Sequence, residues 1–123
     1  MQAVKRTGPT NIVLRKTLRR LRSQARRENA PIWRYVYELL SRPRRLRIVV
    51  NLSKINRHTR PGDVVVVPGK VLGAGTIDHP VTVAAAAFSY TAVRKIREAG
   101  GRVLHITQLM EENPRGSGVK III

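Results

Sequence analysis

Four consecutive valines, at positions 64–67, lie between two Pro-Gly pairs in the segment PGDVVVVPG, residues 61–69. Proline followed by glycine favours a turn, so the segment predicts a strand over residues 63–67 with a turn at each end. A strand with one face in water would carry a polar residue at every second position. Unbroken valine instead indicates a strand that is buried on both faces, as in a sheet covered by helices.

Short strands and short helices alternate through the rest of the second half. Strands are predicted at 48–50, 70–72, 81–85, 103–106 and 119–123, and short helices at 51–55 and 107–112. A longer helix begins after Ser89, a suitable N-cap, and ends at Gly100 and Gly101, of which Gly100 is expected to have a positive φ. Elements of this kind, separated by Gly/Pro turns, predict a compact α/β or α+β domain.

The first half predicts a long basic helix. Its N-cap is Thr10 or Asn11, and the segment Asn29-Ala30-Pro31 ends it. One apolar stripe repeats at helical spacing and consists of Leu14, Leu18, Leu21 and Ala25. Cations run beside this stripe and beyond it: Arg15, Arg19, Arg22 and Arg26, then Lys16, Arg20 and Arg27. At about 100° per residue, positive charge covers nearly half of the helix circumference.

A second helix is predicted from Pro31, which suits a first helical position, to Ser41, with Pro43 ending it. Its apolar side chains, among them Val36 and Leu40, share one face. The 123 residues fit a single folded unit. Within it we predict a basic, largely helical N-terminal extension (residues 1–45) and a compact α/β domain (residues 46–123).

The charge predicts a nucleic-acid partner. The chain has 24 lysines and arginines against 7 aspartates and glutamates, and residues 1–60 hold 17 of these cations with only Glu28 and Glu38 to answer them. Like charge of this density repels itself and needs a polyanion to offset it. The basic helix has no Trp or Phe in its apolar stripe, and no apolar run is long enough to cross a bilayer, so a membrane is not the expected partner.

The expected contacts are made with phosphate, which positions a protein without reading base sequence. The candidate RNA-binding residues are the cations of the first half, with His58 and Lys70 added. They are Lys5, Arg6, Arg15, Lys16, Arg19, Arg20, Arg22, Arg26, Arg27, Arg34, Arg42, Arg44, Arg45, Arg47, Lys54, Arg57, His58, Arg60 and Lys70.

Motifs for catalysis are absent from the sequence. There is no cysteine, which excludes disulfides and thiol chemistry. A phosphate-binding loop around Gly69 and Lys70 would need a glycine at Val64 and a hydroxyl at Val71. The three histidines lie more than twenty residues apart, with no carboxylate three or four residues on. We therefore expect no enzyme activity, no cofactor, no metal and no small-molecule substrate.

Residues 51–89, NLSKINRHTRPGDVVVVPGKVLGAGTIDHPVTVAAAAFS, and 96–123, IREAGGRVLHITQLMEENPRGSGVKIII, resemble a known family. The family is archaeal large-subunit ribosomal protein eighteen-e, the sister family of bacterial large-subunit ribosomal protein fifteen. The resemblance rests on short elements in a fixed order: NLSKI (51–55), GD (62–63), GAG (73–75), VTVA (81–84), FS (88–89), AGG (99–101) and NPRG (113–116).

The resemblance implies a structural component of the large ribosomal subunit, without enzyme activity or cofactor. It implies a small domain of irregular β-β-α turns whose N-terminal extension lies on ribosomal RNA. The implied partners are large-subunit ribosomal RNA and neighbouring large-subunit proteins, in the cytoplasm, and homo-oligomers are not expected. Two alternatives stay open from the residues alone: a DNA-compacting chromosomal protein and, more weakly, an RNA-modifying enzyme with a basic arm.

Overall fold

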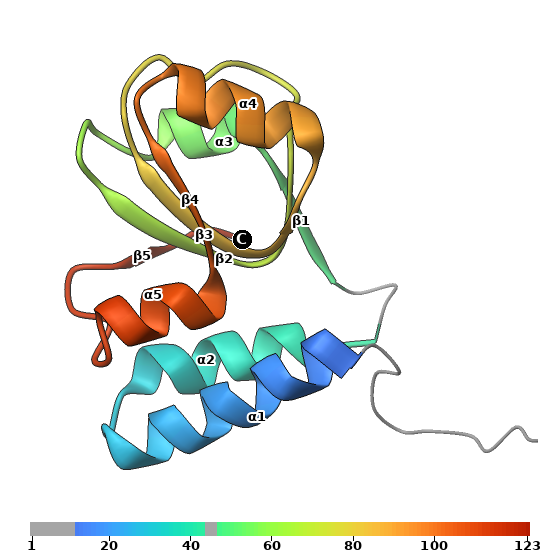
Figure 1. The fold of residues 1–123 in the computed structure, drawn as a ribbon, viewed down its shortest axis with the longest axis vertical. Coiled ribbons are helices and arrows are strands. Elements are labelled where there is room, and N and C mark those ends of the chain that lie inside the picture. The colour runs from blue at the N-terminus through green and yellow to red at the C-terminus, as the bar shows by residue number, and fades with distance from the viewer. Residues whose placement is uncertain (1–11, 44–46) are drawn as a thin grey trace, which may run out of the picture.

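The computed structural model describes residues 12–43 and 47–123. In these residues a parallel sheet lies between two layers of helices (Figure 1). One layer contains α1 (Ile12–Arg27), α2 (Pro31–Leu40) and α5 (Ile106–Glu112), and the other contains α3 (Leu52–Arg57) and α4 (Tyr90–Glu98). The prediction of a compact mixed α/β fold with a helical N-terminal region is confirmed.

The sheet has five strands in the described residues, and every pairing is parallel. They are β1 (Ile48–Asn51), β2 (Val64–Leu72), β3 (Thr82–Phe88), β4 (Arg102–His105) and β5 (Lys120–Ile121). β3 pairs along one edge of β2, while β1 and β5 share the other edge: β5 pairs with Val65 and Val66, and β1 pairs with residues 69–72. β2 is therefore the strand on which the sheet is assembled.

β2 runs through the second Pro-Gly pair, where the sequence predicted a turn. The strands expected at 63–67 and 70–72 are one strand, and its register against β3 shifts between Val67 and Lys70. The shift accommodates Pro68, which has no N–H to donate to a neighbouring strand. Gly69 is required by close packing, because a Cβ there would lie 2.0 Å from the Ile48 carbonyl oxygen of β1.

β2 is buried on both faces, as predicted, through Val65, Val66 and Val67, while Val64 at its start is partly buried. Val65 and Val67 pack with Ile96 of α4 on one face. Val66 packs on the other face with Leu21 of α1 and Trp33 of α2. Helices α1 and α2 thus share a hydrophobic core with the sheet. The predicted boundary between extension and domain falls at residue 45, outside the described residues, and that division of the chain stays a prediction.

Two helix starts in the second half depend on one side chain each. The Ser89 hydroxyl oxygen accepts from the Ala92 N–H (3.2 Å) at the start of α4, as predicted, and Gly100 has a φ of +86° at its end. His105 caps α5: its Nδ1 accepts from the Thr107 N–H (3.2 Å), while the Gln108 side chain accepts from the His105 N–H (2.7 Å). The α5 cap needs a neutral imidazole, because only then does Nδ1 have a free lone pair.

We expect Val65→Asp to abolish cooperative folding, because it buries a carboxylate inside the sheet. The cost is several kcal/mol, a large part of the roughly 5–15 kcal/mol that stabilises a typical domain. The matched control is Val49→Asp on β1, the same change at a side chain that is 57% exposed. Thermal melts followed by circular dichroism should show a native-like transition for the control only; two similar melts would contradict burial of Val65.

We expect the stability of the protein to fall as the pH drops below about 6.5, in part because of His105. Burial lowers the pKa of His105, and the positive charge of Arg20 lowers it further. The unfolded chain then binds the proton more readily than the folded one. His105 therefore gives its full stabilisation above the unfolded pKa, and loses it as the pH falls towards the folded pKa.

The test compares wild type with His105→Asn, which keeps an acceptor at the cap but does not titrate. The free energy of unfolding, from urea titrations between about pH 7.5 and pH 5, should decrease more steeply for wild type. The two proteins differ only at position 105, so the difference between their curves isolates the contribution of His105. Parallel curves would show that the His105 cap does not depend on its protonation state.

Candidate nucleic-acid interface

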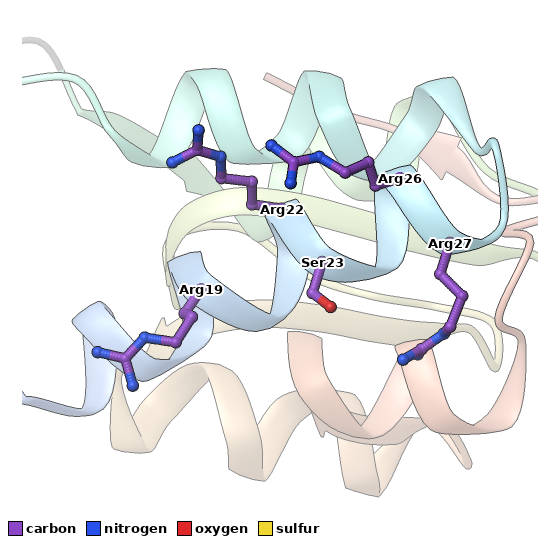
Figure 2. A pocket seen from close by; sticks show the side chains of 5 residues that line it. All are labelled: Arg19, Arg22, Ser23, Arg26 and Arg27. Carbon is purple, nitrogen blue, oxygen red and sulfur yellow. The ribbon is translucent and has the colours of Figure 1, made fainter.

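Helix α1 holds its cations on the side that faces away from the core. Thr17, Leu18, Leu21 and Gln24 are buried against the rest of the protein. The opposite side carries the arginine face, which we define as Arg15, Arg19, Arg22 and Arg26, all of them exposed. In the view of Figure 2, the side chains of Arg22 and Arg26 extend toward α2, whereas those of Arg19 and Arg27 extend the other way, with Ser23 between them. The helical spacing predicted that the four arginines of the face lie together on one side of the helix, beside the apolar stripe.

One buried polar side chain, Gln24, ties α1 to the rest of the protein, and the sequence did not single it out. Its Nε2 donates to the carbonyl oxygens of Met110 and Pro114, both at 3.0 Å. Thr17 is also buried, but its Oγ1 donates to the Val13 carbonyl oxygen of the same helix at 2.9 Å. A glutamine among the basic residues of a helix is normally expected to be exposed to solvent. Its partners are more than 80 positions away, so nothing local in the sequence indicated its burial.

The arginine face has no ion-pair partner in the described part of the chain. The neighbouring cations of α1 do have partners: Arg20 lies 3.1 Å from Glu111, and Arg27 lies 3.9 Å from Glu28. Because residues three and four apart are adjacent on a helix, the four arginines repel one another. The face is thus an uncompensated cationic surface that an anion would stabilise.

Part of this charge lines a hollow of about 620 Å³ between α1 and α2. Arg22 and Arg26 come from α1, and Arg34 and Tyr37 from α2. A single carboxylate, Glu38, reaches it and lies 3.9 Å from Arg34. A second and more open hollow follows α1 and is lined by the residues shown in Figure 2. Guanidinium groups around an open hollow suit the oxygens of a phosphate chain.

The structure distributes the other predicted residues over the molecule. Lys16 is exposed on α1, Arg42 follows α2, and Lys70 is exposed on β2. Arg47 is partly buried, and its Nε donates to the Arg42 carbonyl oxygen at 3.4 Å. Lys5, Arg6, Arg44 and Arg45 lie outside the described residues.

Four predicted residues lie on the other side of the sheet from α1. Lys54 and Arg57 belong to α3, and His58 and Arg60 follow it in the chain (Figure 1). Lys54 Nζ donates to the Ile123 carbonyl oxygen, and His58 Nδ1 lies 2.9 Å from the Lys54 carbonyl oxygen. The candidate set therefore does not form one surface. Which residues share a surface depends on the order of the strands in the sheet. The periodicity of a single helix or strand does not predict that order.

Stacking on Trp33 is excluded, because its side chain is buried and its Nε1 donates to the Pro114 carbonyl oxygen at 2.6 Å. In the described ranges no three His, Asp or Glu side chains gather as a metal site would require, and no helix has the length and apolar character to span a membrane. Exposed cations of the second half were not among the residues predicted from the sequence: Arg94 and Arg97 on α4 and Arg115 after α5. For the two on α4, spacing on one helix face was the available signal.

Comparison with known proteins gives consistent matches over nearly the whole chain. Residues 2–123 match the sequence profile of the family described as "Ribosomal protein 60S L18 and 50S L18e". A Pyrobaculum aerophilum protein named "Large ribosomal subunit protein eL18" is 52% identical over 117 residues, 95% of this chain and 96% of that protein. Proteins of the same name are 53% identical in Methanopyrus kandleri (94% of this chain, 95% of that protein) and 52% identical in Archaeoglobus fulgidus (84% and 88%).

We expect salt to stabilise the protein by screening repulsion within the arginine face. Arg15–Arg19, Arg19–Arg22 and Arg22–Arg26 are three like-charge pairs, each worth a few tenths of a kcal/mol. A triple variant with Arg19, Arg22 and Arg26 changed to Gln removes all three, and glutamine has a similar helix propensity. At about 0.02 M NaCl it should be more stable than wild type by about 1 kcal/mol, and at about 0.5 M the difference should shrink towards zero.

Arg94→Gln serves as the control, because Arg94 Nη1 lies 3.2 Å from the Glu98 carboxylate and its loss removes a favourable pair. That variant should be slightly less stable than wild type at low salt. Urea titrations at the two salt concentrations measure both differences. A triple variant that is less stable than wild type at low salt would show that the arginine face is not self-repelling.

Proposed function

The chain belongs to the family of ribosomal protein 60S L18 and 50S L18e, and we propose that it binds ribosomal RNA through phosphate contacts of its arginine face. Its relatives are named as large ribosomal subunit proteins, so the chain is a structural component of that subunit and not an enzyme. This agrees with the resemblance seen in the sequence. The relation to bacterial large-subunit ribosomal protein fifteen stays a prediction.

One observation carries the proposal: Arg15, Arg19, Arg22 and Arg26 are exposed on one side of a helix, and within residues 12–43 and 47–123 no carboxylate is paired to them. The protein holds the acids that would neutralise them at other places, such as Glu111 beside Arg20. Surface cations of an ordinary soluble domain are interspersed with acids. A polyanion supplies the missing negative charge, and the released counterions favour binding.

The spacing of the arginine face suits a run of phosphates. Arg15 and Arg26 are eleven residues apart, which is about 16 Å along a helix that rises 1.5 Å per residue. That length covers several phosphates of one strand, which in a B-form duplex recur about every 3.4 Å along the axis. Since α1 is fixed by Leu21 and Gln24, the helix axis is set before RNA arrives and only the side chains lose freedom on binding.

The expected partners are large-subunit ribosomal RNA and neighbouring proteins of the subunit, in the cytoplasm. The absence of homo-oligomers and of a small-molecule substrate stays a prediction. The chromosomal alternative loses its support, because the relatives reported above are named for the large ribosomal subunit.

Changing Arg15, Arg19, Arg22 and Arg26 together to Gln should weaken binding to large-subunit ribosomal RNA. Because phosphate contacts read no sequence, the loss should be similar on an unrelated RNA duplex. The slope of log K against log salt should become shallower by up to about 0.9 for each lost phosphate contact. Filter binding at several KCl concentrations measures both quantities.

The matched control changes Arg102 and Arg115 to Gln, since both are exposed arginines that lie near carboxylates, Glu112 at 2.7 Å and Glu28 at 4.0 Å. It should leave the slope nearly unchanged. Circular dichroism confirms that both variants are folded before binding is measured. An unaltered slope in the four-arginine variant would refute phosphate binding by this face.

A further inference from the structure

Helix α4 carries a second cationic surface, and this one includes an exposed aromatic ring. We define the α4 face as Tyr90, Arg94 and Arg97, at positions i, i+4 and i+7. At about 100° per residue both arginines lie within about 40° of Tyr90 around the helix. Ala92 and Ile96 are on the opposite side and are fully buried in the core. The α4 face therefore points away from the sheet, into solvent.

Tyr90 has no role in the fold that explains its presence. Its side chain is 82% exposed, more than any other large apolar side chain in the described residues. In the same part of the chain its hydroxyl makes no hydrogen bond, and the cap of α4 is supplied by Ser89. A tyrosine at this position buries little apolar area and contributes little to stability. It is available to a ligand.

The cations beside Tyr90 are also largely available. Arg97 has no ion pair within the described ranges. Arg94 has one, between its Nη1 and the Glu98 carboxylate at 3.2 Å. Lys95 has a different role: its Nζ donates to the carbonyl oxygens of Gly73 (2.8 Å) and Gly75 (2.7 Å), so it holds a loop of the protein. The α4 face thus presents an exposed ring at the start of the helix, followed on the same side by the two arginines, one and two turns further along.

We propose that the α4 face binds an unpaired nucleotide of RNA, with the Tyr90 ring stacked on the base and Arg94 and Arg97 at phosphates of the strand as it continues along the helix. Exposed aromatics next to arginine are how proteins hold single-stranded RNA. The inference rests on the proposed function, because it assigns a second RNA contact to the same protein. α1 and α4 lie on opposite outer faces of the three layers (Figure 1), so the two contacts are made to different RNA segments and the protein joins them.

The test uses the variant with Gln at positions 15, 19, 22 and 26 as background, so that oligonucleotides are not captured by the arginine face. Fluorescence anisotropy measures binding of a short labelled oligoadenylate at physiological salt. Adding Tyr90→Ala should lower its affinity about 5-fold to 100-fold, the range expected for one stacked base. Tyr90→Phe, which keeps the ring, should bind as the background does, and Tyr35→Ala should have no effect because Tyr35 lies on α2.

Equal oligoadenylate affinity for the background and for Tyr90→Ala would overturn the second contact. If Tyr90→Ala weakened the binding of oligoglutamate and left that of oligoadenylate unchanged, the RNA contact would also be overturned. The α4 face would then be assigned to an acidic protein segment. Binding of an RNA duplex to the wild-type arginine face tests the proposed function separately. With wild type, a donor-labelled duplex and an acceptor-labelled oligoadenylate should show energy transfer that is lost on Tyr90→Ala.

Discussion

The carbonyl oxygen of Pro114 is the contact on which the placement of the basic helix α1 and its neighbour α2 depends. It accepts from Gln24 Nε2 of α1 at 3.0 Å and from Trp33 Nε1 of α2 at 2.6 Å. Both donors belong to buried side chains, and a buried donor without its acceptor costs about 1–3 kcal/mol. One peptide group after α5 thereby holds two helices whose donors precede it by 90 and 81 residues.

A tight turn around Pro114 holds that carbonyl group in position. The Asn113 side chain closes the turn, with Nδ2 donating to the Ser117 carbonyl oxygen at 2.9 Å and Oδ1 accepting from the Ser117 N–H. Gly116 has a φ of +68°, and a Cβ there would lie 2.5 Å from the Ile32 side chain of α2. The NPRG element that contributed to the family resemblance thus orients the cationic surface. In the described residues it supplies one cation of its own, Arg115.

Local signals in the sequence predicted much of the fold. The valine strand, the Ser89 cap and the positive φ of Gly100 each depend on residues close together in the chain, and all three are confirmed. The continuation of β2 through Pro68 was not predicted, because it depends on β1 and β3. The exposure of the arginine face followed from helical spacing alone. Its separation from Lys54 and Arg57 did not, because strand order places α3 on the other side of the sheet.

The residues that carry the family resemblance and the residues proposed to bind RNA obey different physical constraints. Backbone conformation and close packing require glycine at positions 75 and 116, where Gly75 has a φ of +91° and a side chain would collide with its neighbours. A phosphate-binding arginine needs only a positive charge within reach of the RNA, which several nearby positions satisfy equally. The elements that carried the resemblance accordingly all lie in residues 51–116, after the arginine face. The family was recognisable from the scaffold and the arginine face from helical spacing, whereas the α4 face had to be found from exposure and charge in the structure.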